Sequence, residues 1–210
     1  QVVVNERPPD ERDFTNPRSA LDQIRDKINH ITSEYSAGKL NAVQFNAMYR
    51  HYMEKRTIIE KLLERNPDTE AWKAASAPGK TIYLRDRFEA RPLYYVVFRK
   101  GEQKPLMMEG KIPQKAAQQL HKLLMVIWKM QEWKEGLARK SLGDGLWLLL
   151  MIGKQSMTLV VYFFQPSTLQ INRIKDLHAD FERANLQSLE RGMPANRMVF
   201  PQRSLLEKST

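Results

Sequence analysis

The sequence predicts an α+β protein in which an N-terminal αα-hairpin precedes an antiparallel sheet of order β-β-α-β-β-α, flanked by helices. Two observations support this prediction. Apolar residues recur at helical spacing over the first part of the 210-residue chain. Beyond about residue 80, short apolar runs separated by turn residues replace that spacing, which is the pattern of strands and hairpins.

The first predicted helix begins at Asn16 and Pro17, because asparagine is a good N-cap and proline suits the first helical position. Gly38 is suited to end it. Its apolar residues follow one another at spacings of three and four, and they are Leu21, Ile24, Ile28, Ile31 and Tyr35.

The second predicted helix begins with Asn41 as N-cap and Gln44 at the capping-box position, and Asn66 and Pro67 end it. Its apolar stripe consists of Phe45, Met48, Tyr52, Ile59 and Leu62. The stripes of the two helices are too broad to cover one another alone. A second surface must cover them, either another copy in a four-helix bundle or the rest of the chain.

Sheet elements follow a small-residue linker. The predicted order is an edge strand at 81–87, a hairpin of 93–99 and 106–110, a helix at 113–133, a hairpin of 146–152 and 157–164, and a helix at about 171–189. The domain organisation is therefore a linker or arm at 1–15, a helical hairpin at 16–67, a linker at 68–80, an α/β domain at 81–191 and a tail at 192–210. A first residue of Gln1 is expected of a processed chain or of a piece of a longer protein.

The runs 93–98 and 146–152 are apolar at nearly every position, so both faces of their sheet must be covered. We expect the N-terminal hairpin or another molecule to close one of these faces. The interface candidates are the apolar residues of the helix stripes and of the central strand: Leu21, Ile24, Ile28, Phe45, Met48, Tyr52, Leu120, Leu124 and Trp147.

Composition narrows the function classes. The absence of cysteine excludes a disulfide framework, thiolate metal sites and cysteine nucleophiles. The longest apolar stretch, Leu146–Ile152, is far shorter than the roughly 20 residues that cross a bilayer, and the N-terminus does not resemble a signal peptide. We therefore expect a cytoplasmic protein.

The formal net charge of +10 favours acidic partners. Most of the excess lies in residues 81–140, which hold 13 basic and 6 acidic residues, a net charge of +7. The basic-surface candidates Lys115, Lys122 and Lys129 recur every seven residues on one face of the predicted helix. This pattern is typical of a solvated helix face, of a docking surface for an acidic protein, or of a site for nucleic acid or anionic membrane.

Motifs for catalysis are absent from the sequence. Gly79, Lys80 and Thr81 resemble the end of a phosphate-binding loop, but Ala74 occupies the first glycine position, and the predicted strand follows where the mechanism needs a helix. The turn Gly143–Gly145 is predicted to need positive φ. The four histidines lack metal-ligand spacing. We predict no catalytic residue, cofactor or metal.

The stretch 93–190 resembles the roadblock and dynein light-chain family of the profilin-like group, which includes longin domains. The resemblance depends on the two hairpins, the intervening helix, the Leu-Gly-Asp-Gly-Leu run at 142–146 and the closing helix. It implies a non-enzymatic module that dimerises and serves as a platform for a small GTPase or a signalling assembly. It also implies self-contact through Gln114–Trp133 and Leu146–Ile152.

We therefore expect a homodimeric interaction or regulatory module, with an acidic protein or a small GTPase as a further partner. Two alternatives stay open. A sensory domain of the GAF kind would hold a small molecule between Tyr95, Phe98, Trp147 and Phe164. A basic-surface binder would bind nucleic acid or anionic membrane through the three lysines.

Overall fold

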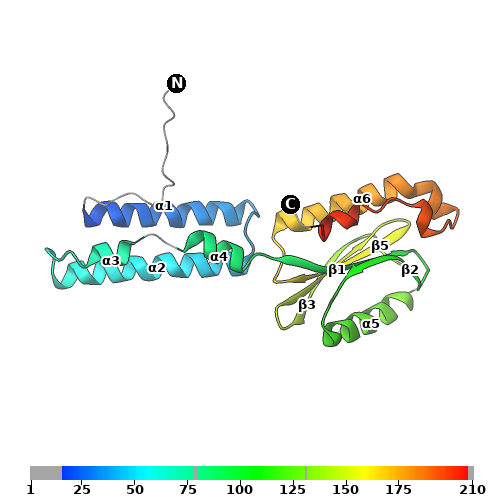
Figure 1. Cartoon of the computed structure of the whole chain (residues 1–210), viewed down its shortest axis with the longest axis horizontal. Coiled ribbons are helices and arrows are strands. Elements are labelled where there is room, and N and C mark those ends of the chain that lie inside the picture. Colours follow the sequence, from blue (N-terminus) through cyan, green and yellow to red (C-terminus); the bar gives the residue numbers. More distant parts are fainter. Residues whose placement is uncertain (1–15, 78–79, 131, 208–210) are drawn as a thin grey trace, which may run out of the picture. The chain divides into compact units, whose positions relative to one another are not determined.

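The chain divides into two compact units between Glu89 and Ala90. The computed structural model in Figure 1 describes residues 16–77, 80–130 and 132–207. The predicted arm at 1–15, Gly79 and the last residues of the tail at 208–210 lie outside the described residues. The α+β class is confirmed, with a helical pair in the first unit and an antiparallel sheet flanked by helices in the second.

The helical pair of the first unit has the predicted ends. Helix α1 (Pro17–Ser36) begins at Asn16, whose side chain accepts a hydrogen bond from the Ser19 N–H. Helix α2 (Ala42–Arg65) begins with a complete capping box of Asn41 and Gln44. The caps form because they satisfy backbone N–H groups that have no partner inside the helix.

Two short helices, α3 (Trp72–Ser76) and α4 (Thr81–Arg87), supply the further cover that the helical stripes need. Trp72 is buried in the same core as Met48 and Tyr52. The predicted edge strand at 81–87 is wrong, since this segment is α4 and belongs to the first unit. Tertiary contacts hold the helix in place: Arg85 forms an ion pair with Glu34, and its carbonyl accepts a hydrogen bond from the Gln44 side chain.

The second unit contains a sheet of five antiparallel strands in the order β2-β1-β5-β4-β3. The strands are β1 (Arg91–Arg99), β2 (Pro105–Gly110), β3 (Gly136–Gly143), β4 (Leu146–Ile152) and β5 (Ser156–Phe163). Both predicted hairpins are present. Strand β3 was not predicted, and it lies at one edge of the sheet, paired with β4.

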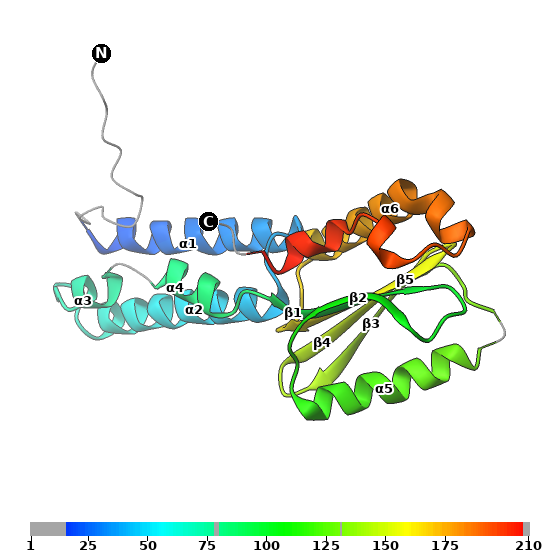
Figure 2. The same ribbon diagram turned by 45° about the vertical axis from the view of Figure 1, so that its right-hand side comes forward.

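Helices α5 (Gln114–Trp128) and α6 (Thr168–Glu190) lie on opposite faces of this sheet, as Figures 1 and 2 show. Alternate residues of each central strand enter two separate cores. On β4, Leu148 packs on the α5 side and Leu149 on the α6 side. The prediction that both faces are covered is confirmed. The expectation that the N-terminal hairpin or another molecule closes one of them is wrong, because α6 and the tail do so.

Helix α5 is shorter than predicted. It ends at Trp128, and the next two amides, those of Lys129 and Met130, bond to carbonyls only three residues earlier. This tightening is typical of the last turn of a helix. The predicted turn at Gly143–Gly145 is confirmed, with positive φ at all three residues.

The tail beyond Arg191 belongs to the second unit. Asn185 of α6 donates to the Val199 carbonyl and accepts from the Val199 N–H, at 2.7 and 2.8 Å. Phe200 stacks on Phe181 with 5.3 Å between ring centroids. The short helix Pro201–Leu205 then buries Leu205 in the core on the α6 side. Residues 192–207 therefore complete the cover of the sheet.

Candidate functional site

The three lysines singled out by the sequence lie on the outer side of α5. Lys115, Lys122 and Lys129 are all exposed. The opposite side of the helix, with Ala116, Leu120, Leu124 and Ile127, is buried against the sheet. The seven-residue spacing therefore produces one continuous basic stripe, as predicted.

Two contacts locate the ends of α5 on the sheet. The Lys115 ammonium lies 3.1 Å from a carboxylate oxygen of Asp144, in the turn between β3 and β4. On the other flank of α5, Trp128 packs edge-on against Phe98 of β1, with 5.7 Å between ring centroids. Lys115, at the start of the stripe, therefore lies beside the β3–β4 turn.

The strand on that side adds a further cation. Lys140 pairs with Leu148, whose side chain enters the core beneath α5, so Lys140 projects from the same face of the sheet as α5. Arg139 projects from the other face. Because β3 is an edge strand, its outer N–H and C=O groups pair with no strand among the described residues.

We call this region the α5–β3 face and define it by Lys115, Lys122, Val126, Lys129, Ala138 and Lys140, all of which are exposed. Val126 is 61% exposed and gives the face an apolar centre. Asp144 forms an ion pair with Lys115, but both side chains are about 70% exposed, so the pair contributes little to stability. A hollow of about 170 Å³ opens beside this pair, lined by Leu93, Pro113, Ala116, Leu142, Leu146 and Phe163.

The predicted interface candidates are mostly inside the chain's own cores. Those buried are Ile24, Met48, Tyr52, Leu120 and Leu124. Those partly buried are Leu21, Ile28, Phe45 and Trp147. Their burial is explained by packing within each unit, so these side chains do not form an open surface for a second copy.

The aromatic residues expected to line a small-molecule cavity do not converge. Phe98 is buried in the core beneath α5. Tyr95, Trp147 and Phe164 belong to the core on the opposite side of the sheet. The four rings therefore fill two separate cores.

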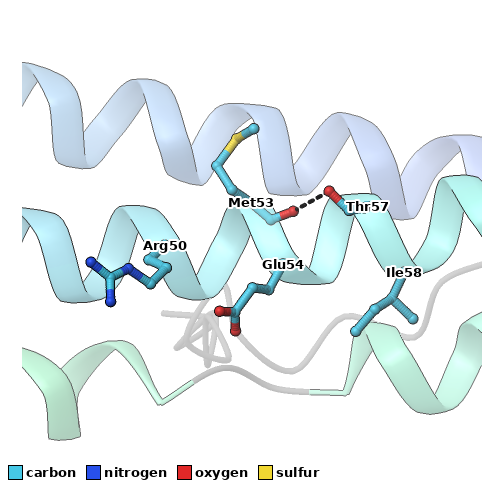
Figure 3. Close-up of a pocket in the computed structure, with 5 residues that line it drawn as sticks. All are labelled: Arg50, Met53, Glu54, Thr57 and Ile58. Carbon is cyan, nitrogen blue, oxygen red and sulfur yellow. Dashed lines mark hydrogen bonds between the residues drawn. The ribbon is translucent and has the colours of Figure 1, made fainter.

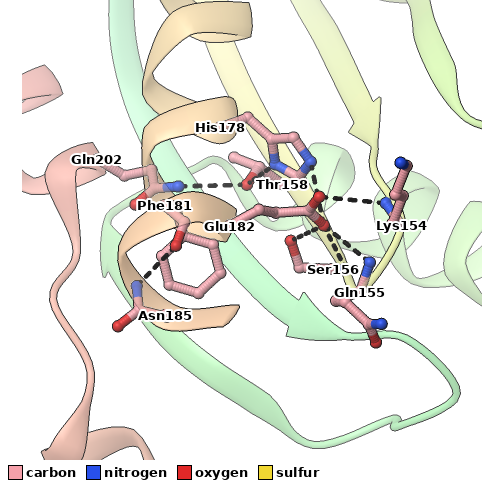
Figure 4. Close-up of polar contacts among 9 residues, drawn as sticks. All are labelled: Lys154, Gln155, Ser156, Thr158, His178, Phe181, Glu182, Asn185 and Gln202. Atoms are coloured by element: carbon pink, nitrogen blue, oxygen red, sulfur yellow. Dashed lines mark hydrogen bonds and ion pairs between the residues drawn. The ribbon is translucent and has the colours of Figure 1, made fainter. Parts of the chain in front are cut away.

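A polar cluster lies between α6 and β5 (Figure 4). The Gln202 amide lies 3.5 Å from the Thr158 hydroxyl, which is 2.9 Å from Nδ1 of His178. If the amide donates to Thr158, the hydroxyl donates to Nδ1, and the histidine proton is on Nε2. This nitrogen faces a carboxylate oxygen of Glu182 at 3.9 Å. Burial lowers the pKa of His178, and Glu182 raises it by a smaller amount.

This threonine, histidine and glutamate arrangement is closed to substrates. His178 is 3% exposed, and Thr158 and Gln202 are at least as deeply buried. A nucleophile must reach its substrate, and the Thr158 hydroxyl does not. We therefore assign the cluster a structural role.

Glu182 explains that role. Its carboxylate accepts hydrogen bonds from the backbone N–H groups of Lys154, Gln155 and Ser156 and from the Ser156 hydroxyl, at 2.8 to 3.2 Å. Three consecutive amides of the β4–β5 turn thus converge on one carboxylate (Figure 4). Gly153 permits this approach, since a Cβ there would lie 2.4 Å from the carboxylate oxygen. Glu182 therefore anchors the turn to α6.

A shallow hollow of about 380 Å³ lies on α2, lined by Arg50, Met53, Glu54, Thr57 and Ile58 (Figure 3). These residues occupy two turns of one helix, and the Thr57 hydroxyl is bonded to the Met53 carbonyl. The hollow lacks the enclosure that ligand pockets need. Among the described residues, no group of three or more acidic or histidine side chains is placed to hold a metal ion. In the same residues, no helix is both long and apolar enough to cross a bilayer.

Comparisons with known proteins add nothing to this geometry. No family model matches the chain, and no curated protein or solved structure matches it. Sequence reasoning identified the α5 lysines and grouped Lys140 with the basic residues near one end of that helix, but it did not place Lys140 on a strand, because β3 was not predicted. The sequence signal for β3 was a pair of core-facing leucines, Leu137 and Leu142, on either side of the basic residues Arg139 and Lys140.

Proposed function

We propose that the chain is a non-enzymatic interaction module and that its second unit binds an acidic protein segment on the α5–β3 face. The observation that supports this proposal is that the lysine stripe of α5 and Lys140 of the open-edged strand β3 lie on the same side of the sheet. A segment that adds to this edge gains backbone hydrogen bonds, and its acidic side chains meet Lys122 and Lys140. Val126 offers an apolar contact between the charges.

A homodimer is the second candidate, and the open edge of β3 favours it. Two copies joined along this edge would bring Lys140 and the α5 lysines of each copy close together. Like charges repel, and salt screens the repulsion. Homodimerisation through this face should therefore strengthen as salt is added, whereas binding of an acidic segment should weaken.

The experiment uses the full chain and a fluorescein-labelled peptide of about 12 residues with alternating valine and glutamate, which favours an extended strand. Fluorescence anisotropy should show saturable binding at about 50 mM NaCl. The affinity should be at least about tenfold lower at about 500 mM NaCl, because salt screens the charges. The double variant Lys122→Glu with Lys140→Glu should abolish binding. The matched control, Lys61→Glu with Lys175→Glu, changes the net charge equally at exposed positions elsewhere and should retain at least half the affinity.

Equal losses in both double variants would show that only net charge matters and would contradict the proposal. Tighter binding of a labelled oligo-thymidylate or of phosphatidylserine vesicles than of the peptide would assign the face to nucleic acid or anionic membrane instead. Sedimentation velocity at both salt concentrations tests the homodimer. A dimer that strengthens with salt and is lost in the Val126→Glu variant would replace the acidic segment as the function of this face.

A further inference from the structure

The hollow beside the Lys115–Asp144 pair has walls from several elements of the second unit. Strands β1, β3, β4 and β5 each contribute one residue, and the start of α5 and the β3–β4 turn contribute the others. The lining is apolar except for Lys115 and Asp144, which are both about 70% exposed and so lie at the rim. A side chain that enters this hollow is shielded from water on several sides, unlike one that lies on the open hollow of α2.

The backbone around this hollow is strained. Among the residues that the structure describes, only Asp144 and Phe164 have positive φ without being glycine, at 52° and 66°. Asp144 lines the hollow, and Phe164 directly follows Phe163, which also lines it. Aspartate tolerates this conformation, but a bulky aromatic residue rarely adopts it. Such strain persists only where the surrounding structure enforces it, and it is concentrated at functional sites.

Contacts between the end of β5 and the β3–β4 turn enforce this conformation. The Phe164 N–H donates to the Gly145 carbonyl at 2.7 Å. The Phe163 ring lies against the turn, since a Cβ at Gly145 would be only 3.2 Å from it. The Phe163 side chain is nevertheless 39% exposed. The hollow is therefore formed before any partner binds, and one of its walls is an accessible aromatic ring.

The size and the lining of the hollow favour one kind of occupant. Its volume of about 170 Å³ is below the range of about 300 to 1,000 Å³ that is typical of pockets for small molecules. An apolar lining favours a hydrocarbon side chain, because a polar side chain buried there would lose its hydrogen bonds to water. The hollow therefore suits a single side chain such as leucine.

The hollow is continuous with the α5–β3 face, because Lys115 belongs to both. A segment that pairs along β3 and continues past Leu142 reaches the Gly143–Gly145 turn, where Asp144 lines the hollow. We infer that the hollow binds a leucine-like side chain that the acidic segment carries just beyond its β3-paired part. This inference rests on the proposed function and adds a determinant of specificity to it. The lysines and the strand edge bind the acidic segment, and the hollow selects one apolar residue of that segment.

Fluorescence anisotropy of the full chain with extended forms of the valine and glutamate peptide tests the inference. A leucine is attached through one glycine to either end of the peptide, because a segment can pair with an edge strand in either direction, and serine replaces the leucine in the matched peptides. One of the leucine peptides should bind at least about tenfold tighter than its serine counterpart, because the leucine side chain is buried in the hollow. This ratio should be the same at about 50 and about 150 mM NaCl, because salt screens the charges but not the apolar contact.

Two further measurements locate the leucine. Phe163→Ala removes the exposed wall of the hollow and should abolish the difference between the leucine and serine peptides. Leu169→Ala is the matched control, since it shortens an exposed apolar side chain of α6, and it should preserve the difference. In NMR spectra of the wild-type complex, the methyl groups of the peptide leucine should show nuclear Overhauser contacts to the Phe163 ring, a readout that needs no substitution.

The outcomes separate this inference from the proposed function. Equal affinity of the leucine and serine peptides would leave the proposed function intact and would overturn the inference alone. If neither peptide binds saturably, the proposed function fails and the inference fails with it. A leucine preference that persists in Phe163→Ala, or the absence of contacts to the Phe163 ring in the saturated complex, would place the leucine elsewhere and would also overturn the inference.

Discussion

Replacing Glu182 with alanine removes the acceptor that holds the β4–β5 turn against α6. Four hydrogen bonds end on this carboxylate, three from consecutive backbone amides and one from the Ser156 hydroxyl. The amides of Lys154 and Gln155 lie near the surface, where water can replace the lost acceptor. Ser156 is fully buried, so its N–H and its hydroxyl would both lose their partner without replacement.

The expected loss of stability follows from those two buried donors. An unsatisfied buried polar group costs about 1 to 3 kcal/mol, and a bond to a charged acceptor lies at the upper end of the range. Glu182→Ala should therefore lower the free energy of unfolding of the second unit by about 3 kcal/mol. Glu182→Gln keeps a carbonyl acceptor but loses the charge, so about half of that loss is expected.

Guanidinium unfolding followed by fluorescence of Trp128, Trp133 and Trp147 measures this loss, since these tryptophans lie in the second unit. Asp176→Ala is the matched control, because it removes an exposed carboxylate from the same helix. It should change stability by less than about 0.5 kcal/mol. If Glu182→Ala were equally mild, the role of Glu182 as an anchor of the turn would be refuted.

Three further predictions test the second unit. Because burial lowers the pKa of His178, the unfolded chain binds a proton below about pH 6.5 that the folded chain resists. The urea concentration at the unfolding midpoint should therefore decrease as the pH falls below about 6.5. His178→Gln should make the midpoint depend less on pH, and an unchanged pH dependence in this variant would contradict the lowered pKa of His178. Asn185→Ala removes two hydrogen bonds to Val199, so hydrogen exchange at 193–207 should become faster. The free energy of unfolding should fall by about 2 kcal/mol. Unchanged exchange would show that Asn185 does not hold the tail in place. In urea unfolding, Gly110→Ala should destabilise the protein by more than about 2 kcal/mol and Gly101→Ala by about 1 kcal/mol. Both glycines have positive φ, but only at Gly110 would a Cβ meet backbone, 2.1 Å from the Leu93 oxygen. Equal losses in the two variants would contradict this explanation.

The helical unit was largely predictable because its signals are local. Asn16, Asn41 and Gln44 act within one turn of each helix, and the apolar spacing reports a buried face directly. Helix α4 was not predictable in this way. Its sequence places three apolar residues, Ile82–Leu84, before three charged ones, Arg85–Arg87, without the spacing of a helical stripe. Its helical state depends on distant partners such as Glu34.

The two-layered cover of the sheet was only half predictable. The near-continuous apolar runs of β1 and β4 correctly indicated burial on both faces. They carried no information on which segments supply the cover. The tail contributes through Val199 and Phe200, which contact Asn185 and Phe181 of α6 rather than their sequence neighbours.

The part of the candidate site on helix α5 was predictable from sequence, but the part that depends on the pairing of two strands was not. Lys115, Lys122 and Lys129 follow from helical geometry alone. Lys140 lies on the same side of the sheet only because β3 pairs with β4 in the register that sets Lys140 opposite Leu148. His178 and Glu182 are one helical turn apart. The sequence contains no sign that the amides of the β4–β5 turn donate hydrogen bonds to Glu182.

Hydrogen exchange of the full chain, with and without the alternating valine and glutamate peptide, tests the central proposal most directly. A segment that adds to the open edge of β3 must bond to its outer amides, and bonded amides exchange slowly. We predict slower exchange at 136–143, together with smaller changes along α5. Unchanged exchange at 136–143 in the presence of saturating peptide, or protection confined to α6 or to the first unit, would contradict the account.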